Sequence, residues 1–221
     1  HSLAIDVIPQ IVQFGPIPVN SFGLMVALAV IAASILLQRS FALNSINPIL
    51  AEKFVFSGAL SGLLGARVWY LAENWSQVKS APFQALFASA GFTFYGGFII
   101  AIITLYFIAR RNQIHFMQFL DCVGPAMALG YAVGRLGCQL SGDGDYGMAT
   151  TSWWGMSYET GVVPTPPGIL VYPTPLFESA ASICIAWWLV HVEKSNWTQR
   201  RALRFALYLA LMSIERFSVE F

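Results

Sequence analysis

The sequence predicts an all-α, polytopic integral membrane protein: a bundle of six spanning helices with its N-terminus outside and a small cap of loops at one end. Hydrophobic residues make up 57% of the 221-residue chain and charged residues 10%, whereas a soluble domain usually contains about 25% charged residues. The mean hydropathy is +0.63. Apolar runs close to the roughly 20 residues that cross a bilayer as a helix also recur along the chain.

Six stretches are predicted as spans because each is long and mostly apolar. The second contains Gly62 and Gly65 among other small residues, which let helices approach closely in lipid. The six stretches are residues 17–37, 54–72, 93–109, 116–133, 175–192 and 202–221. A seventh helix beyond residue 221 is expected to bring the chain back across the membrane.

Two connections have structure of their own in this prediction. Residues 80–91 are apolar but too short to span, so we expect a half-helix lying at the membrane interface. Residues 135–173 are rich in Gly, Pro, Trp and Tyr and are expected to form the cap. The whole chain, residues 1–221, is predicted to be a single transmembrane domain.

The distribution of lysine and arginine predicts the orientation, because cytoplasmic loops carry an excess of these residues. Eight of the 12 basic residues fall near the first, third and fifth connections. We therefore expect these connections in the cytoplasm and the cap outside. The eight are Arg39, Lys53, Arg110, Arg111, Lys194, Arg200, Arg201 and Arg204.

Three further arginines lie within or at the edge of predicted spans. At 1.5 Å per residue, Arg67, Arg135 and Arg216 all fall in the outer half of the membrane, and so do Glu178 and Glu220. A charge inside a span costs about 2.5 to 3.5 kcal/mol and usually faces a cavity or a partner. These residues predict a polar chamber open to the outer leaflet. Alternatively, Arg67 snorkels to the interface and Arg216 only pairs with a carboxylate to hold helices together.

The stretch from 134 to 147, GRLGCQLSGDGDYG, begins where the fourth apolar run ends. Five glycines in fourteen residues predict a tight turn that can approach a ligand closely. The turn also carries Arg135, Asp143 and Asp145. Because the planar guanidinium group matches phosphate oxygens, an arginine pair near the outer leaflet would suit a phospholipid headgroup.

This stretch resembles the signature of the prolipoprotein diacylglyceryl transferases. Further similar segments follow in the order of that family and cover nearly the whole chain. They are NSFGLMVAL from Asn20, GARVWYL from Gly65, FTFYGGFIIA from Phe92, PTPLFES from Pro173 and ERFSVEF from Glu215.

The resemblance implies an enzyme of the bacterial cytoplasmic membrane whose site faces outward. It would transfer the diacylglyceryl group of phosphatidylglycerol to the lipobox cysteine of a preprolipoprotein, leaving a thioether and releasing glycerol phosphate. Its implied partners are phosphatidylglycerol, the preprolipoprotein signal peptide with its lipobox, and membrane lipids. No metal or redox cofactor is expected.

The resemblance also implies site residues. Arg135 and Arg216 would bind the lipid phosphate and stabilise the charge that develops as glycerol phosphate departs. Glu178 and Glu220 would orient these arginines. The other residues expected to shape the turn or contact substrate are Gly134, Gly137, Ser141, Gly142, Asp143, Gly147 and Arg67.

The chain departs from the family pattern where a base would be expected. Tyr95 replaces the usual histidine before a Gly-Gly pair, Phe22 replaces a tyrosine, and Cys138 stands where asparagine is common. A cysteine thiol needs a base or a cationic environment to become a thiolate. We expect Tyr95 to orient the substrate or relay a proton, with Asp143, Asp145 or the field of the arginines as alternatives.

The same residues allow other functions and sites. A catalytically silent phospholipid-binding or lipid-moving protein of the same fold is the main alternative, and a small-anion transporter is disfavoured because no internal repeat is visible. A net charge of +1 without a basic patch gives no reason to expect nucleic-acid binding. Asp143 and Asp145 are expected to cap the turn or pair with arginine rather than hold a cation.

Overall fold

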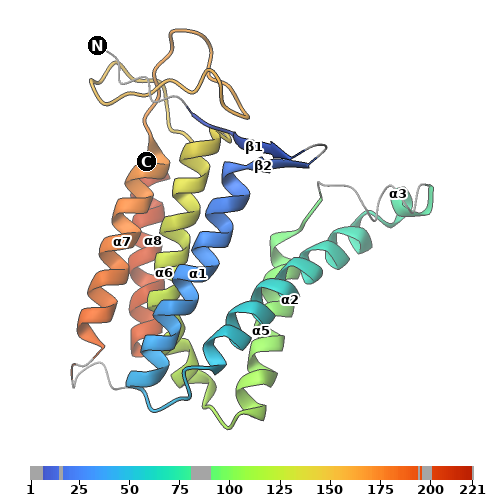
Figure 1. The fold of residues 1–221 in the computed structure, drawn as a ribbon, viewed down its shortest axis with the longest axis vertical. Helices are drawn as coiled ribbons and strands as arrows, with labels where there is room; N and C mark the ends of the chain where they lie inside the picture. Colours follow the sequence, from blue (N-terminus) through green and yellow to red (C-terminus); the bar gives the residue numbers. More distant parts are fainter. Residues whose placement is uncertain (1–6, 15–16, 81–90, 194, 196–200, 221) are drawn as a thin grey trace. The chain divides into compact units, whose positions relative to one another are not determined.

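The computed structural model of the chain describes residues 7–14, 17–80, 91–193, 195 and 201–220 (Figure 1). The chain divides into two compact units. The first unit comprises His1–Ser40 and Leu120–Phe221, and the second unit comprises Phe41–Phe119. We describe each unit separately.

Helices dominate both units, as expected. The first unit contains most of α1 (Ser21–Leu43) and α6 (Phe116–Ser141), together with α7 (Thr174–Val192) and α8 (Leu203–Glu220). The second unit contains α2 (Leu50–Glu73), α3 (Trp75–Ser80) and α5 (Phe94–Arg111). Among the described residues, α1, α2, α5, α6 and α7 are long and apolar enough to cross a membrane. The prediction of a polytopic helical membrane protein is therefore confirmed.

The sixth predicted span is present as the helix α8, but it is less apolar than the other five. Its 18 residues carry four charges, and it does not belong to the set of membrane-crossing helices found in the described part of the chain. The charged residues are Arg204, Glu215, Arg216 and Glu220. These charges matter for the candidate site below.

The first span begins later than predicted, because a β-hairpin precedes it. Strands β1 (Gln10–Phe14) and β2 (Ile17–Asn20) pair antiparallel, with Phe14 opposite Ile17. Residue 17 precedes Pro18, and both the fixed proline ring and its effect on the preceding residue disfavour helix and favour extended backbone. The helix therefore begins at Ser21 rather than at residue 17, and the sequence did not predict the hairpin.

Small residues of α6 allow its neighbours to pack closely in the first unit. A Cβ atom built on Gly130 would lie 3.6 Å from Ala33 of α1, and one on Gly124 would lie 3.3 Å from Tyr208 of α8. Ala128, Ala186, Leu189 and Tyr208 form a buried cluster that joins α6, α7 and α8. Such close approach is the usual basis of helix association in lipid.

A buried ion pair joins α7 to α8 at the end of the first unit that lies opposite the hairpin. The Arg204 guanidinium lies 2.5 Å from the Glu193 carboxylate, and Ser40 of α1 donates a hydrogen bond to the same carboxylate. Asp121 of α6 accepts hydrogen bonds of 2.7 and 3.0 Å from two backbone N–H groups at the start of α8. Arg204 is thus a buried structural residue, although the sequence analysis counted it among the charges of a cytoplasmic connection.

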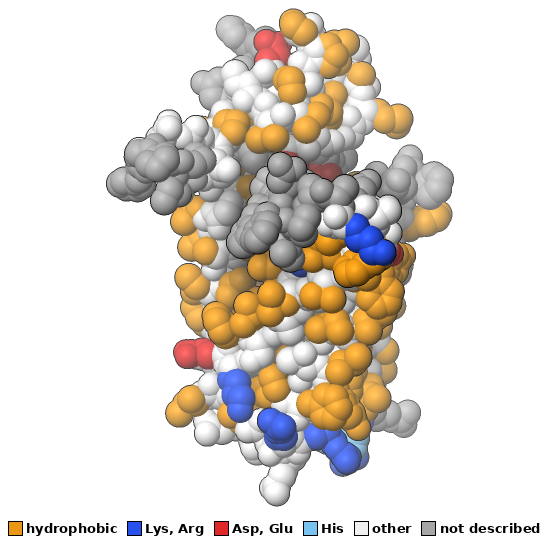
Figure 2. Space-filling model, turned by 90° about the vertical axis from the view of Figure 1, so that its right-hand side faces the viewer, with side chains coloured by type: hydrophobic (Ala, Val, Ile, Leu, Met, Phe, Trp, Pro, Cys, Tyr) orange, Lys and Arg blue, Asp and Glu red, His pale blue; other side chains and the backbone are white. Residues whose placement is uncertain are grey.

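The second unit is built on the contact between α2 and α5. Gly65 and Gly96 face each other across this contact, and a Cβ on Gly96 would lie 2.2 Å from the Cβ of Trp69. The small residues of the second span therefore have the packing role that was expected of them. Many apolar side chains of these two helices remain exposed, including Phe56, Leu63 and Phe107, as lipid-facing residues would be (Figure 2). The predicted half-helix at 80–91 falls almost wholly on residues 81–90, outside the described residues.

Candidate active site

The predicted glycine-rich turn is helical over its first half. Helix α6 continues through Ser141, so Gly134 and Gly137 lie inside it, and the prediction that a loop begins near residue 135 is wrong. Tertiary packing outweighs the low helix propensity of glycine here. A Cβ on Gly137 would lie 3.0 Å from Met25 of α1, so this position lets α1 and α6 approach each other.

The turn itself comprises residues 142–147, and two of its glycines are required by the backbone or its surroundings. Gly142 has a φ of +60°, and a Cβ there would lie 2.8 Å from the Cα of Gly161. A Cβ on Gly147 would lie 2.8 Å from the side chain of Thr174. Glycine tolerates both the positive φ and the close approach. The turn is held against the cap by a 2.8 Å hydrogen bond from the Gly147 N–H to the Tyr172 carbonyl.

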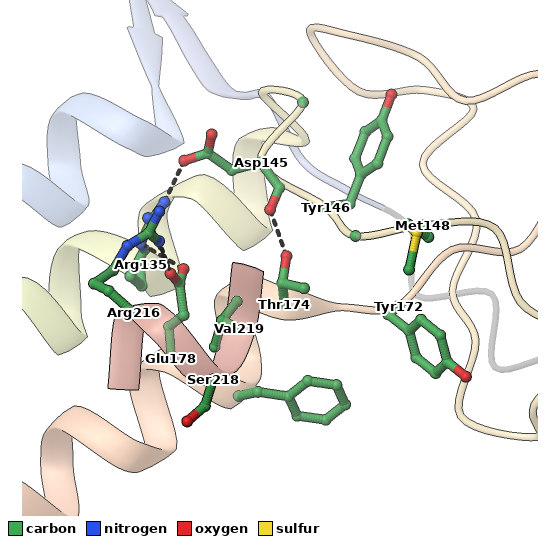
Figure 3. Close-up of a pocket in the computed structure, with 13 residues that line it drawn as sticks. Arg135, Asp145, Tyr146, Met148, Tyr172, Thr174, Glu178, Arg216, Ser218 and Val219 are labelled. Carbon is green, nitrogen blue, oxygen red and sulfur yellow. Dashed lines mark hydrogen bonds and ion pairs between the residues drawn. The ribbon is translucent and has the colours of Figure 1, made fainter. Parts of the chain in front are cut away.

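Arg135 of α6 and Arg216 of α8 meet at a single carboxylate, that of Glu178 on α7 (Figure 3). The Nε atom of Arg135 lies 2.6 Å from Glu178 Oε2, and Arg216 forms an ion pair with Oε1 of the same group. The Glu178 side chain is only 1% exposed. Tyr131 completes this arrangement: its hydroxyl accepts a 2.9 Å hydrogen bond from Arg135 and donates one of 3.2 Å to Glu178.

Arg135 holds a second carboxylate, that of Asp145 in the turn. The two carboxylates differ in exposure, because the Asp145 side chain is 52% exposed and that of Glu178 is almost fully buried. The backbone of Asp145 is anchored separately, since its carbonyl accepts a 2.5 Å hydrogen bond from the Thr174 hydroxyl.

These groups lie on the wall of an open cavity of about 760 Å³. Its lining combines the two arginines and their carboxylates with aromatic and apolar side chains from the turn, the cap, α7 and α8. The lining residues are Arg135, Gly144, Asp145, Tyr146, Gly147, Met148, Tyr172, Thr174, Phe177, Glu178, Arg216, Ser218 and Val219. A cavity that joins apolar walls to a pair of guanidinium groups suits an amphiphilic anion.

The structure brings together some of the predicted site residues and leaves others elsewhere. Arg135, Asp145, Gly147, Glu178 and Arg216 line the cavity, whereas five other predicted residues of the signature do not. The Ser141 hydroxyl donates to the Cys138 carbonyl at 3.2 Å. The residues outside the cavity lining are Gly134, Gly137, Ser141, Gly142 and Asp143.

Two predicted residues belong to the second unit. The Arg67 guanidinium donates a 2.8 Å hydrogen bond to the Gly91 carbonyl and lies over the Phe92 ring. Tyr95 lies in the first turn of α5, and its side chain is 70% exposed. Their roles at the site stay predictions, as does that of Glu220, whose side chain lies outside the described part of the structure.

Two residues of the site were not predicted. Tyr131 could have been found, because it lies four residues before Arg135 and therefore on the same helix face. Thr174 could not, since its contact with Asp145 depends on the path of the cap. Asp145 itself was expected to pair with arginine or cap the turn, and the Asp143 carboxylate accepts a 3.5 Å hydrogen bond from its N–H.

Asp143, Asp145 and Cys138 place one ligand atom each within 4.8 Å of one another. Asp145 is already paired with a cation, the Arg135 guanidinium. Asp145 therefore pairs with arginine, and the sequence had favoured such a pair over a bound cation.

Tyr158 supports the cavity from within the cap. Its side chain is buried, its hydroxyl donates a 2.8 Å hydrogen bond to Gln139, and its ring stacks on that of Tyr146, which lines the cavity. Burial raises the pKa of Tyr158 to about 12, and the hydrogen bond to Gln139 opposes this shift only partly.

A pH-dependent stability of the cap follows from this shift. The folded protein keeps the Tyr158 proton to a higher pH than the unfolded chain does, so the stabilisation is complete below about pH 10 and is lost as the pH rises through about 12. We expect the melting temperature in detergent to fall across this window and Tyr158→Phe to make the fall shallower. An unchanged slope in the variant would assign the alkaline loss to other groups.

Comparisons with known proteins agree with the geometry of the site. Residues 9–221 match the family model described as prolipoprotein diacylglyceryl transferase. Three relatives are each named phosphatidylglycerol–prolipoprotein diacylglyceryl transferase. That of Leptospira interrogans serogroup Icterohaemorrhagiae serovar copenhageni is 28% identical over 91% of this chain and 70% of its own length. That of Chromohalobacter salexigens is 30% identical over 98% of this chain and 79% of its own length. That of Francisella tularensis subsp. novicida is 31% identical over 96% of this chain and 79% of its own length.

Proposed function

This chain belongs to the prolipoprotein diacylglyceryl transferase family, and we propose that it transfers the diacylglyceryl group of phosphatidylglycerol to the lipobox cysteine of preprolipoproteins. The observation that carries the site assignment is the meeting of Arg135 and Arg216 at one cavity wall. Guanidinium groups bind phosphate oxygens through two parallel hydrogen bonds, and such bonds are stronger where water is scarce.

The arginines have a defined task in this reaction. The cysteine sulfur attacks the glyceryl carbon that carries the phosphate, and the bond between that carbon and the phosphate oxygen breaks. Negative charge therefore grows on the departing glycerol phosphate. Arg135 and Arg216 stabilise this charge, and Glu178 holds both guanidinium groups in position before the lipid arrives.

The apolar walls of the cavity suit the acyl chains of the lipid. Phe177, Val219 and Met148 line it beside the charged groups. We place the protein in the bacterial inner membrane as a multi-pass protein with this cavity facing the outer leaflet. The distribution of basic residues supports that orientation, since the positive-inside rule assigns to the cytoplasm the helix ends that carry an excess of lysine and arginine. Those residues are Arg39, Lys53, Arg110 and Arg111, near the ends of α1, α2 and α5.

The remaining site residues keep the roles that the resemblance implies. We propose that Tyr95 orients the substrate or relays a proton, that Arg67 contacts the lipid headgroup, and that Glu220 helps to orient the arginines. Gly134, Gly137, Gly142 and Gly147 shape the end of α6 and the turn, while Ser141 and Asp143 stabilise it.

The test uses the full chain in vesicles that contain phosphatidylglycerol, with a synthetic lipobox peptide added. We expect the peptide to gain the mass of a diacylglyceryl group and glycerol phosphate to appear in equal amount. A peptide with serine in place of the cysteine is the matched control and should remain unchanged. Binding of the lipid without any transfer would instead support the catalytically silent alternative, which the departures at Tyr95, Phe22 and Cys138 motivate.

A further inference from the structure

We propose that Asp145 is the proton acceptor for the attacking thiol, and that it becomes available when the lipid phosphate displaces it from Arg135. The inference rests on the proposed function. It concerns a residue of the turn that lines the cavity and pairs with Arg135.

The carboxylates around the arginines compete with an incoming phosphate. Among the ion pairs of the described residues, the Arg135 and Arg216 guanidinium groups pair with the Glu178 and Asp145 carboxylates. A phosphodiester brings one further negative charge to the same two arginines. An anion that binds Arg135 therefore competes with the carboxylates that are already there.

Asp145 is the carboxylate that the phosphate displaces from Arg135. Glu178 is 1% exposed and is held by both arginines and by the Tyr131 hydroxyl, whereas the Asp145 side chain is 52% exposed and pairs with Arg135 alone among the described ion pairs. An exposed ion pair is worth at most about 1 kcal/mol, while breaking a buried one costs several times more. The incoming phosphate thus exchanges with Asp145 and leaves Glu178 in place.

The displaced carboxylate stays in the cavity. The Asp145 carbonyl is fixed to the Thr174 hydroxyl at 2.5 Å, and the Gly147 N–H is bonded to the Tyr172 carbonyl at 2.8 Å. The backbone of the turn is therefore held directly after this side chain. Rotation about the side-chain bonds of Asp145 moves the carboxylate away from Arg135 while its backbone stays at the cavity.

Few other groups in the cavity could accept the thiol proton. No histidine is among the lining residues that the structure describes, and Glu178 is engaged by both arginines. The Tyr172 hydroxyl points away from the arginines in Figure 3.

The step balances without an oxidant or reductant. The cysteine S–H proton moves to the Asp145 carboxylate while the sulfur forms its bond to the glyceryl carbon. The carbon–oxygen bond to phosphate breaks, and its electron pair leaves on glycerol phosphate. Asp145 then returns the proton to the departing phosphate or to water and pairs again with Arg135.

Asp145→Asn tests both parts of the proposal, because it removes the competing charge and the proton acceptor together. Soluble glycerol phosphate serves as the probe of anion binding through its inhibition constant. We expect this inhibition constant and the KM for phosphatidylglycerol to fall about threefold to fivefold, and kcat to fall about 100-fold. If Asp145 only stabilised the turn, its substitution would not lower the inhibition constant of glycerol phosphate and kcat together.

Two further variants complete the test. Glu159→Gln makes the same change of carboxylate to amide in the cap, where Glu159 lies outside the cavity lining and contacts Ser157 and the Gly168 N–H. Glu159→Gln should keep the wild-type values of kcat, KM and the inhibition constant of glycerol phosphate. Asp145→Glu should recover at least about a tenth of the wild-type kcat. Unchanged kcat in Asp145→Asn, or weaker binding of glycerol phosphate, would overturn the inference, whereas a wild-type protein without transferase activity would overturn the proposed function instead.

Discussion

Replacing Arg135 by alanine is expected to lower kcat/KM for diacylglyceryl transfer by at least about 100-fold. Loss of one group that stabilises developing negative charge typically costs 10²-fold to 10³-fold in rate. Arg135 is also the residue that joins the buried carboxylate of Glu178 to the exposed one of Asp145. The measurement is the rate of peptide modification in phosphatidylglycerol vesicles, and the same variant should fail to rescue cells depleted of their own transferase.

Two substitutions control for simpler explanations. Arg39→Ala removes an exposed arginine from α1, away from the cavity lining, and should leave the rate unchanged. Arg135→Lys keeps the charge but loses the planar pair of donors, so it should recover only a small part of the activity. If Arg135→Ala retained more than about a tenth of wild-type kcat/KM, this arginine would not bind the phosphate in the transition state.

Glu178→Ala is expected to reduce both stability and activity. Its carboxylate is 1% exposed and stands between two guanidinium groups and a tyrosine hydroxyl. Removing one partner of a buried ion pair usually destabilises a protein by about 3 to 5 kcal/mol, because a charge is left without compensation. Arg216 is 47% exposed and can turn to water, so most of the cost falls on Arg135, and we expect about 3 kcal/mol.

Thermal unfolding in detergent micelles measures this loss. Glu178→Gln retains the size of the side chain and an oxygen that can accept hydrogen bonds, so it should unfold at a temperature between those of the wild type and of Glu178→Ala. The rate of diacylglyceryl transfer should likewise be highest in the wild type, intermediate in Glu178→Gln and lowest in Glu178→Ala. A Glu178→Ala protein as stable as the wild type would show that the two arginines do not depend on this carboxylate.

The membrane architecture was accessible from the sequence because hydropathy acts locally. Each of the five long apolar helices corresponds to a predicted span, but α1 extends six residues and α6 eight residues past the predicted end of its span. The presence of Arg135, Arg216 and Glu178 in apolar surroundings was also enough to predict a polar chamber, because charges in spans need partners. Their meeting at one cavity agrees with that reasoning.

What the sequence could not supply depends on packing between segments. The helical state of residues 134–141 follows from the fit of Gly137 against Met25, which no local pattern records. The choice of Asp145 rather than Asp143 as the partner of Arg135 follows from the path of the turn, which Thr174 and Tyr172 hold in place. The paired state of Arg204 likewise depends on contacts with a distant part of the chain.

The ion pairs Glu178–Arg216 and Glu193–Arg204 bridge the same two helices, α7 and α8, near their opposite ends. Fifteen residues separate the two glutamates, which corresponds to roughly 22 Å along the axis of α7. If the Glu193–Arg204 ion pair stays closed while a bulky lipid enters between α7 and α8, it acts as a hinge between the two helices. Each degree by which the helices tilt apart then separates them by roughly 0.4 Å more at the level of Glu178. A modest tilt therefore admits an acyl chain while the helices stay packed at their other end.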